Sequence, residues 1–155
     1  MSYNPKLKAV VTQNIDGLHQ AAGSKRVLEL HGNWTRLECT GCGARSTIDD
    51  FDEARAGRVP HCPSCSAVVR PDIVFYGEAL DPATLEGAVL TIAGADMLIV
   101  GGTSLAVYPA AGLIDYYQGG RRVLMNATPT PYDGRADLII RVPIGRVFAQ
   151  IQGHV

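Results

Sequence analysis

Thr12-Gln13-Asn14-Ile15-Asp16-Gly17-Leu18-His19 follows directly on the apolar run Ala9-Val10-Val11, and the chain is organised around this junction. A β-branched run that ends abruptly in polar residues and a glycine predicts a buried strand leading to a crevice. In open α/β sheets, ligands bind at the carboxyl ends of the strands. Gln13, Asn14 and Asp16 offer two amides and a carboxylate there, although an ordinary Asn-Asp turn would use the same residues.

Length and composition indicate one globular domain, or one domain with a small insert. The 155 residues are 46% hydrophobic and 19% charged, with a net charge of −1. The sequence has no block of basic residues that would predict nucleic-acid binding. Its apolar run at 97–100 is far too short to span a bilayer. Residues 1–6 lack the apolar core of a signal peptide, so we expect a cytoplasmic protein without a membrane partner. In that compartment the cysteines are expected to be metal ligands or free thiols.

Strand and helix signals alternate along most of the chain. Strands are expected at residues 9–11, 27–32, 97–102, 122–126 and 136–140. Helices are expected at residues 49–57, 81–92, 108–118 and 144–152, with a short helix or loop at 17–23. Buried strands joined by helices predict an α/β fold with a doubly wound parallel sheet and helices on both faces.

Four cysteines form two CxxC pairs, Cys39 with Cys42 and Cys62 with Cys65, and 19 residues separate the pairs. This spacing is typical of a four-cysteine zinc site, because each pair presents two thiolates from a tight turn. We predict one structural zinc ion; four unrelated thiols or two disulfides are the alternative. The surrounding segment has few long apolar runs, so we divide the chain into a main domain at 1–35 and 72–155 and an inserted zinc-binding module at 36–71.

His31 lies near the end of the predicted strand at 27–32, toward the same sheet edge as Asn14 and Asp16. Imidazole titrates near neutrality, which suits a general base, whereas a lone histidine often has a structural role. The pattern therefore makes His31 a candidate catalytic residue.

Two further stretches are candidates for ligand contacts. Gly101-Gly102-Thr103-Ser104 follows a predicted strand and offers N–H and hydroxyl groups that suit a phosphate or ribose, or simply forms a turn; Asn126 is placed similarly after the next strand. Ile73-Val74-Phe75-Tyr76-Gly77-Glu78 leaves the cysteine segment with apolar backbone to which an extended peptide could add, or is a linker packed on the core.

Taken together, these stretches resemble the sirtuins, the NAD-dependent protein-lysine deacylases. The matching motifs occur in the family's order over nearly the whole chain and are Thr12-Gln13-Asn14-Ile15-Asp16-Gly17-Leu18-His19, Leu30-His31-Gly32, the two CxxC pairs, Arg70-Pro71, Tyr76-Gly77-Glu78, Gly102-Thr103-Ser104-Leu105 with Val107 and Pro109, and Asn126. The resemblance implies a Rossmann-like domain with an inserted zinc module, with NAD and acyl-lysine meeting between them.

The resemblance also implies roles for individual residues. In the family, the histidine matching His31 is the general base toward the nicotinamide ribose; the acyl oxygen attacks the ribose carbon as nicotinamide leaves, and the products are free lysine and O-acyl-ADP-ribose. The implied catalytic residues are His31 and Asn14. The implied cofactor-binding residues are Gln13, Asn14, Ile15, Asp16, Gly102, Thr103, Ser104 and Asn126. The implied contacts to an acylated-lysine protein or peptide are Val74, Phe75, Gly77, Glu78, Val107 and Tyr108.

Two features of the family's amino-terminal region have no counterpart in this sequence: a Gly-Ala-Gly loop that cradles the NAD pyrophosphate, and an Asp-Phe-Arg segment over the reactive ribose. We therefore expect this chain to bind NAD weakly, and to self-associate through sheet edges beside Val10-Val11 and Met97-Leu98. The alternatives to a deacylase are an NAD-dependent protein ADP-ribosyltransferase and an inactive, zinc-stabilised binding module.

Overall fold

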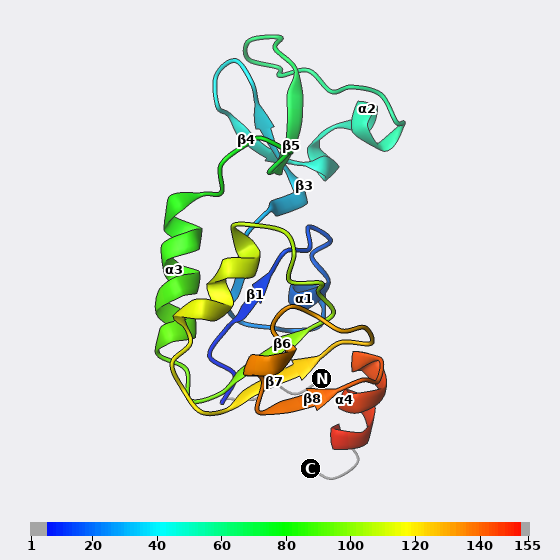
Figure 1. The fold of residues 1–155 in the computed structure, drawn as a ribbon. Coiled ribbons are helices and arrows are strands. Elements are labelled where there is room, and N and C mark those ends of the chain that lie inside the picture. Colours follow the sequence, from blue (N-terminus) through cyan, green and yellow to red (C-terminus); the bar gives the residue numbers. More distant parts are fainter. Residues whose placement is uncertain (1–5, 153–155) are drawn as a thin grey trace. The chain divides into compact units, whose positions relative to one another are not determined.

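The computed structural model describes residues 6–152, and the chain divides into two compact units, Met1–Leu85 and Glu86–Val155. The described residues form three sheets, a parallel pair and an antiparallel sheet in the first unit and a parallel sheet in the second (Figure 1). Residues 1–5, which belong to the amino-terminal stretch expected to lack a signal peptide, lie outside the described residues. No helix within 6–152 is long and apolar enough to cross a membrane.

The first unit begins with the predicted strand that precedes the polar stretch. Strand β1 (Val10–Thr12) pairs in parallel with β2 (Val27–Glu29), and the short helix α1 (Leu18–Ala21) connects them. The second strand was predicted to continue to residue 32, but it ends at Glu29. The chain turns there because Gly32 adopts a left-handed φ of 77° and passes so close to β5 that a Cβ would overlap the carbonyl oxygen of Asp72.

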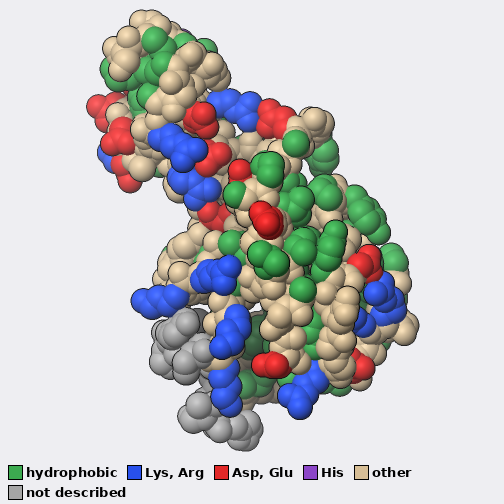
Figure 2. Space-filling view, turned by 90° about the vertical axis from the view of Figure 1, so that its left-hand side faces the viewer, with side chains coloured by type: hydrophobic (Ala, Val, Ile, Leu, Met, Phe, Trp, Pro, Cys, Tyr) green, Lys and Arg blue, Asp and Glu red, His purple; other side chains and the backbone are tan. Residues whose placement is uncertain are grey.

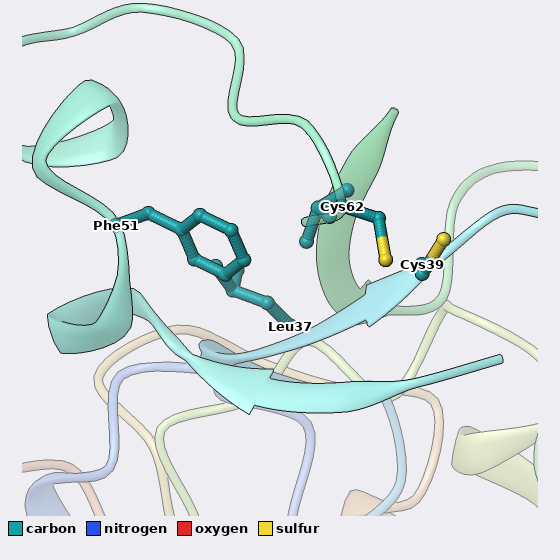
Figure 3. Packing of buried hydrophobic residues seen from close by; sticks show 5 residues of the cluster. Leu37, Cys39, Phe51 and Cys62 are labelled. Atoms are coloured by element: carbon teal, nitrogen blue, oxygen red, sulfur yellow. The ribbon is translucent and has the colours of Figure 1, made fainter. Parts of the chain in front are cut away.

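The cysteine-containing segment forms an antiparallel sheet in the order β4-β3-β5. Its strands are β3 (Gly32–Cys39), β4 (Arg45–Thr47) and β5 (Val69–Ile73). One face is apolar, and its core consists of Leu37, Cys39, Phe51, Cys62 and Val69 (Figure 3). The charged residues Arg36, Glu38 and Arg70 alternate with these apolar positions in the sequence, as the two-residue period of a strand requires. Figure 2 shows acidic and basic side chains intermixed in the part of the picture that holds this sheet.

The helix predicted at 49–57 is interrupted. A 3₁₀ helix η1 (Ile48–Asp50) and helix α2 (Asp52–Arg55) flank Phe51, which is extended with φ −131° and ψ 110°. The Phe51 ring is directed at Leu37 (Figure 3), and Phe51 is only 9% exposed. Burying this ring offsets the loss of one helical residue, because an aromatic side chain contributes about 1.5–3 kcal/mol on burial.

The second unit contains a parallel sheet in the order β6-β7-β8, formed by β6 (Leu98–Gly101), β7 (Arg122–Met125) and β8 (Leu138–Ile140). Its core contains Leu105, Ile114, Leu124 and Tyr132, and a short 3₁₀ helix η3 (Asp133–Arg135) precedes β8. Ile99 is 46% exposed, so β6 alternates in burial instead of being buried throughout.

Two predicted helices of this part of the chain are confirmed. They are α3 (Pro82–Ala93), which joins the two units, and α4 (Ile144–Gln152) (Figure 1). Asp81 caps α3 as expected, since its Oδ2 accepts hydrogen bonds from the Thr84 backbone N–H at 2.7 Å and from the Thr84 hydroxyl at 2.8 Å.

The helix predicted at 108–118 is shorter than expected and is not an α-helix. That segment is a 3₁₀ helix, η2 (Ala110–Tyr116), whose buried residues are Ala110, Ala111, Leu113 and Ile114. The burial therefore repeats every three residues, which matches three residues per turn. The chain then extends at Tyr117, which places its hydroxyl to donate to the Asp96 carbonyl oxygen at 3.0 Å.

The predicted α/β class with parallel strands is confirmed. Within residues 6–152, the parallel strands hydrogen-bond as two separate sheets, of two and three strands. Polar residues follow the carboxyl ends of strands in both units, and they include candidate site residues.

Candidate functional site

His31 lies in the turn between β2 and β3, beside the polar stretch that follows β1. Its Nδ1 atom is 3.0 Å from the backbone carbonyl oxygen of Gln13. A carbonyl oxygen only accepts hydrogen bonds, so Nδ1 carries the proton in the neutral ring, and Nε2 keeps its lone pair. The ring is half-buried. This arrangement leaves Nε2 of His31 available to accept a proton near the end of the parallel pair.

Asn14 and Asp16 follow β1 and are both exposed. The Asn14 backbone N–H donates to the Thr12 hydroxyl at 3.1 Å, and Asp16 Oδ1 accepts from the Leu18 backbone N–H at 3.0 Å. These bonds are those of a strand-end turn that leads into α1. They leave the amide of Asn14 and the second carboxylate oxygen of Asp16 at the surface, where they can contact a ligand.

Glu29, two residues before His31 in the sequence, is the centre of a cluster that joins β2, α1 and β3. Glu29 Oε1 accepts from Gln20 in α1 and from Asn33 in β3, both at 2.7 Å, and Oε2 accepts from Arg36 at 2.6 Å. The Glu29 side chain is only 8% exposed. Burial raises the pKa of this carboxyl, but the hydrogen bonds from Arg36, Asn33 and Gln20 outweigh burial and hold the pKa below its usual value.

This Glu29 cluster was not predicted from the sequence. Its signal was present, because Glu29 is a charged residue inside the apolar run Val27-Leu28-Glu29-Leu30, two positions before His31. A carboxylate that interrupts a buried strand must find partners. The partners, however, come from α1 and β3, and only the folded chain brings them together.

In the second unit, Gly102 and Asn126 follow neighbouring parallel strands at the same sheet edge. Gly101 pairs with Met125, and the Gly102 backbone N–H donates to the Met125 carbonyl oxygen at 3.0 Å. The Asn126 side-chain nitrogen donates to the carbonyl oxygen of Thr128 at 2.9 Å, so its Oδ1 remains to accept a hydrogen bond. Such an edge is where parallel α/β sheets bind ligands.

The loop after β6 is held in a defined shape. Gly102 has a left-handed φ of 65°, and the Leu105 backbone N–H donates to the Thr103 hydroxyl at 3.2 Å. Leu105 itself has a φ of 53° and is buried, so packing in the core maintains a backbone shape that leucine rarely adopts. Ser104 lies exposed between these anchored residues.

The residues expected to contact a peptide are found in both units. Val74 is half-buried and Phe75 is 50% exposed, and they follow β5 directly. In the second unit, Val107 is 51% and Tyr108 68% exposed. Gly77 and Glu78 are also at the surface, and the Val74 backbone N–H donates to the His31 carbonyl oxygen at 3.0 Å. The segment after β5 is therefore bonded directly to the candidate base.

The four cysteines form one cluster, as their spacing predicted. Their Sγ atoms all lie within 4.8 Å of one another, with 3.4 Å between Cys39 and Cys65 and 3.7 Å between Cys42 and Cys62. Four thiolates about 2.3 Å from a tetrahedral zinc would be roughly 3.8 Å apart. All four are free thiols, at sulfur separations too long for disulfides. The sulfurs are thus positioned to bind a structural zinc ion.

The pKa values of the cysteine thiols also favour binding of a metal cation by this cluster. Backbone hydrogen bonding at Cys42 is the main cause that lowers the pKa of Cys39 to about 6. A backbone hydrogen bond from Ala67 favours the Cys65 thiolate, but hydrogen bonding with the other three cysteines and burial together outweigh it and raise the pKa of Cys65 to about 12. One thiol therefore ionises readily while its neighbour resists a second negative charge. A divalent cation supplies the charge that allows all four to ionise.

Comparison with known proteins identifies a family that this chain resembles. A model of the Sir2 family matches residues 1–109. The chain is 49% identical over 146 residues to an "NAD-dependent protein deacetylase" of Clostridium acetobutylicum, which covers 94% of this chain and 59% of the relative. It is 44% identical over 150 residues to a protein of the same name from Cutibacterium acnes, with coverages of 97% and 60%. The chain therefore spans about three fifths of the length of these curated relatives.

Solved structures agree with this comparison. One described as "Sir2-p53 peptide-NAD+" superimposes with a TM-score of 0.87 at 40% identity, over 95% of this chain and 62% of the other. Another, described as "Sir2 bound to acetylated peptide", gives a TM-score of 0.87 at 39% identity, over 95% and 63% of the two chains.

Proposed function

Since this chain belongs to the Sir2 family, we propose that it removes acyl groups from protein lysines with NAD as co-substrate. The products are nicotinamide, O-acyl-ADP-ribose and free lysine. The observation that carries the proposal is the hydrogen bond between His31 Nδ1 and the Gln13 carbonyl oxygen, because it orients a neutral imidazole as a base. The relatives' names and the peptide and NAD complexes of the similar structures support it.

In this proposal, Nε2 of His31 accepts a proton from a ribose hydroxyl of NAD. Its partner across Nδ1 is a main-chain carbonyl, so the ring keeps one orientation when it becomes positively charged. Asn14 and Asp16 face the nicotinamide and ribose, with Gln13 and Ile15 beside them. Gly102, Thr103, Ser104 and Asn126 hold the remainder of the dinucleotide, through the sheet edge that ends β6 and β7.

The acylated lysine is proposed to arrive on an extended peptide. Strand β5 lies at the edge of its sheet, and the partly exposed residues Val74 and Phe75 that follow it are proposed to contact this peptide. Gly77 and Glu78 of the first unit, and Val107 and Tyr108 of the second, are proposed to contact the same peptide. The bond from the Val74 N–H to the His31 carbonyl oxygen links the peptide segment to the base.

We also propose that residues 36–71 act as a zinc-binding module inserted in a main domain of 1–35 and 72–155. The support is the separate antiparallel sheet with its own core of Leu37, Phe51 and the cysteines. A zinc ion held by the four cysteines would have no open position for chemistry, because four sulfurs would complete a tetrahedron. Its role is to fix the sheet from which the peptide segment emerges.

The direct test uses the 155-residue chain with NAD and an acetyl-lysine peptide, analysed by mass spectrometry. We expect slow formation of deacetylated peptide and O-acetyl-ADP-ribose, and weak NAD binding in calorimetry. Attachment of ADP-ribose to protein instead would support the transferase alternative. Absence of both products and of NAD binding would contradict a catalytic role and leave the zinc-stabilised binding module.

Self-association is a further part of the proposal. Among the described residues, β1 pairs only with β2, and β6 only with β7, so each strand has an unpaired edge. Met97, which directly precedes β6, is 48% exposed, and Ile99 within β6 is 46% exposed. Unpaired edges with apolar side chains promote pairing with another chain. Sedimentation velocity should show oligomers whose proportion rises with concentration, and a monomer at all concentrations would contradict this.

A further inference from the structure

We propose that Arg70 is a positioning residue that fixes the peptide-binding segment at residues 73–78. This inference rests on the proposed function, in which that segment receives the acyl-lysine peptide. Arg70 lies in β5, before this segment. Its side chain contacts the first residue of the segment, Ile73, and the last, Glu78.

The guanidinium makes two parallel bonds to one carboxylate. Arg70 Nη1 donates to Glu78 Oε1 and Nη2 donates to Glu78 Oε2, both at 2.9 Å. Nη2 also donates to the Ile73 carbonyl oxygen at 3.0 Å. The first and last residues of the segment are thus held by one rigid planar group, a geometry that a lysine ammonium cannot reproduce.

The contacts extend to the middle of the segment. The Arg70 guanidinium carbon lies 4.9 Å from the centroid of the Phe75 ring. Glu78 Oε2 accepts from the Phe75 backbone N–H, and the Glu78 backbone N–H donates to the Phe75 carbonyl oxygen, both at 3.0 Å. Stacking and hydrogen bonds therefore close the segment into one compact turn around Arg70.

This turn determines what the segment presents to a peptide. It engages the amide of Phe75 and leaves Tyr76 fully exposed at the tip. At its start, the Val74 N–H is bonded to the His31 carbonyl oxygen. A shift of the turn would therefore move the peptide relative to the base. Misplacement by about 1 Å at a reacting centre can cost a hundredfold in rate.

The same residue connects the turn to the cysteine cluster. Arg70 follows Val69, which packs in the core with Cys39 and Cys62 and pairs with Cys39 across the sheet. The backbone that carries Arg70 is thus fixed by the module, while its side chain is 40% exposed. An exposed pair contributes little to global stability, about 0–1 kcal/mol. Replacing Arg70 should therefore loosen the turn without unfolding the sheet.

The experiment compares Arg70→Lys and Glu78→Gln with Arg55→Lys as a matched control. Arg55 pairs with Asp49 at 2.8 Å on the same module, away from the segment. In both test variants we expect the Phe75 amide to exchange hydrogen about tenfold faster, and acetyl-lysine peptide to bind about tenfold more weakly. NAD affinity, zinc content and melting temperature should match the unmodified chain, as should every property of the control.

Unchanged exchange at Phe75 in both variants would overturn the proposal. So would faster exchange with unchanged peptide affinity, because the turn would then be ordered without serving the substrate. If the unmodified chain binds no acyl-lysine peptide, the proposed function fails and the substrate role of Arg70 fails with it. Exchange at Phe75 would still show separately whether Arg70 orders the turn.

Discussion

The Nδ1 atom of His31 lies 3.0 Å from the backbone carbonyl oxygen of Gln13. The two residues come from the ends of neighbouring parallel strands, so the pairing of β1 with β2 sets the tautomer of the imidazole. The Gln13 backbone carbonyl does not titrate near neutral pH. Substitution of the Gln13 side chain would also leave this carbonyl in place. The orientation of His31 is therefore a property of the fold.

Nitrogen-15 chemical shifts of the neutral form of the His31 ring should show a protonated Nδ1 and an unprotonated Nε2. The reason is that the Gln13 carbonyl oxygen accepts a hydrogen bond and cannot donate one. A neutral ring with its proton on Nε2 would contradict the proposed orientation. The exposed His61 provides a reference spectrum within the same chain.

His31→Ala should lower turnover at least about a hundredfold, the lower range for removal of a general base. NAD affinity should remain close to that of the unmodified chain, because one imidazole at a ribose hydroxyl contributes little to ground-state binding. Single-turnover kinetics and calorimetry measure the two quantities. His61→Ala serves as the control, and near-normal turnover in His31→Ala would exclude His31 from the mechanism.

One zinc ion per chain is expected in elemental analysis of protein purified without chelator. Cys62→Ala should lose the metal and unfold the antiparallel sheet, since structural zinc contributes roughly 10 kcal/mol to small modules. Cys62 also lies in the core with Leu37 and Phe51. The control Ser64→Ala, inside the same CxxC turn, should keep both the zinc ion and the fold. A chain that contains no zinc but keeps an intact antiparallel sheet would contradict this assignment.

The Glu29 cluster predicts a pH dependence of stability. Hydrogen bonds lower the folded-state pKa of Glu29, so its contribution is complete above the unfolded pKa of about 4.3 and is lost as pH falls through the folded value. Glu29→Gln should destabilise the chain by about 1–3 kcal/mol at pH 7, because buried donors lose a charged acceptor.

Urea unfolding of both proteins from pH 7 to pH 3 measures this effect. Acid also protonates the cysteines, so the informative quantity is the stability difference between Glu29→Gln and the unmodified chain. That difference should shrink below about pH 4. A difference that stays constant with pH would show that the Glu29 charge does not stabilise the fold.

Gly32 should be far less replaceable than Gly57, although both have a left-handed φ, 77° and 70° respectively. Gly57→Ala adds a Cβ with no atom within 4 Å, so its cost is limited to about 1–2 kcal/mol of backbone strain. Gly32→Ala adds the same strain and also places a Cβ on the Asp72 carbonyl oxygen. We expect a clearly larger loss in thermal stability and a displaced His31 signal; equal losses would contradict the close approach of β3 and β5.

Patterns within a few residues were predictable from the sequence. The apolar runs that became β1 and β7, the Asp81-Pro82 start of α3 and the closing helix α4 are each determined by neighbouring residues. The cysteine cluster was predictable too, because each CxxC turn is local and zinc chemistry requires four ligands. These signals do not depend on distant parts of the chain.

Tertiary packing decided the rest. Phe51 interrupts a helical sequence because its ring is more stable against Leu37 than in solvent, and η2 adopts three residues per turn because its apolar positions repeat every three. The sequence by itself determined the parallel strands, helices α3 and α4, the cysteine cluster and the candidate base, but not the antiparallel strands β3, β4 and β5. Only the folded chain determined which nitrogen of His31 is free and what neutralises Glu29, because their partners are a main-chain carbonyl and side chains from separate elements.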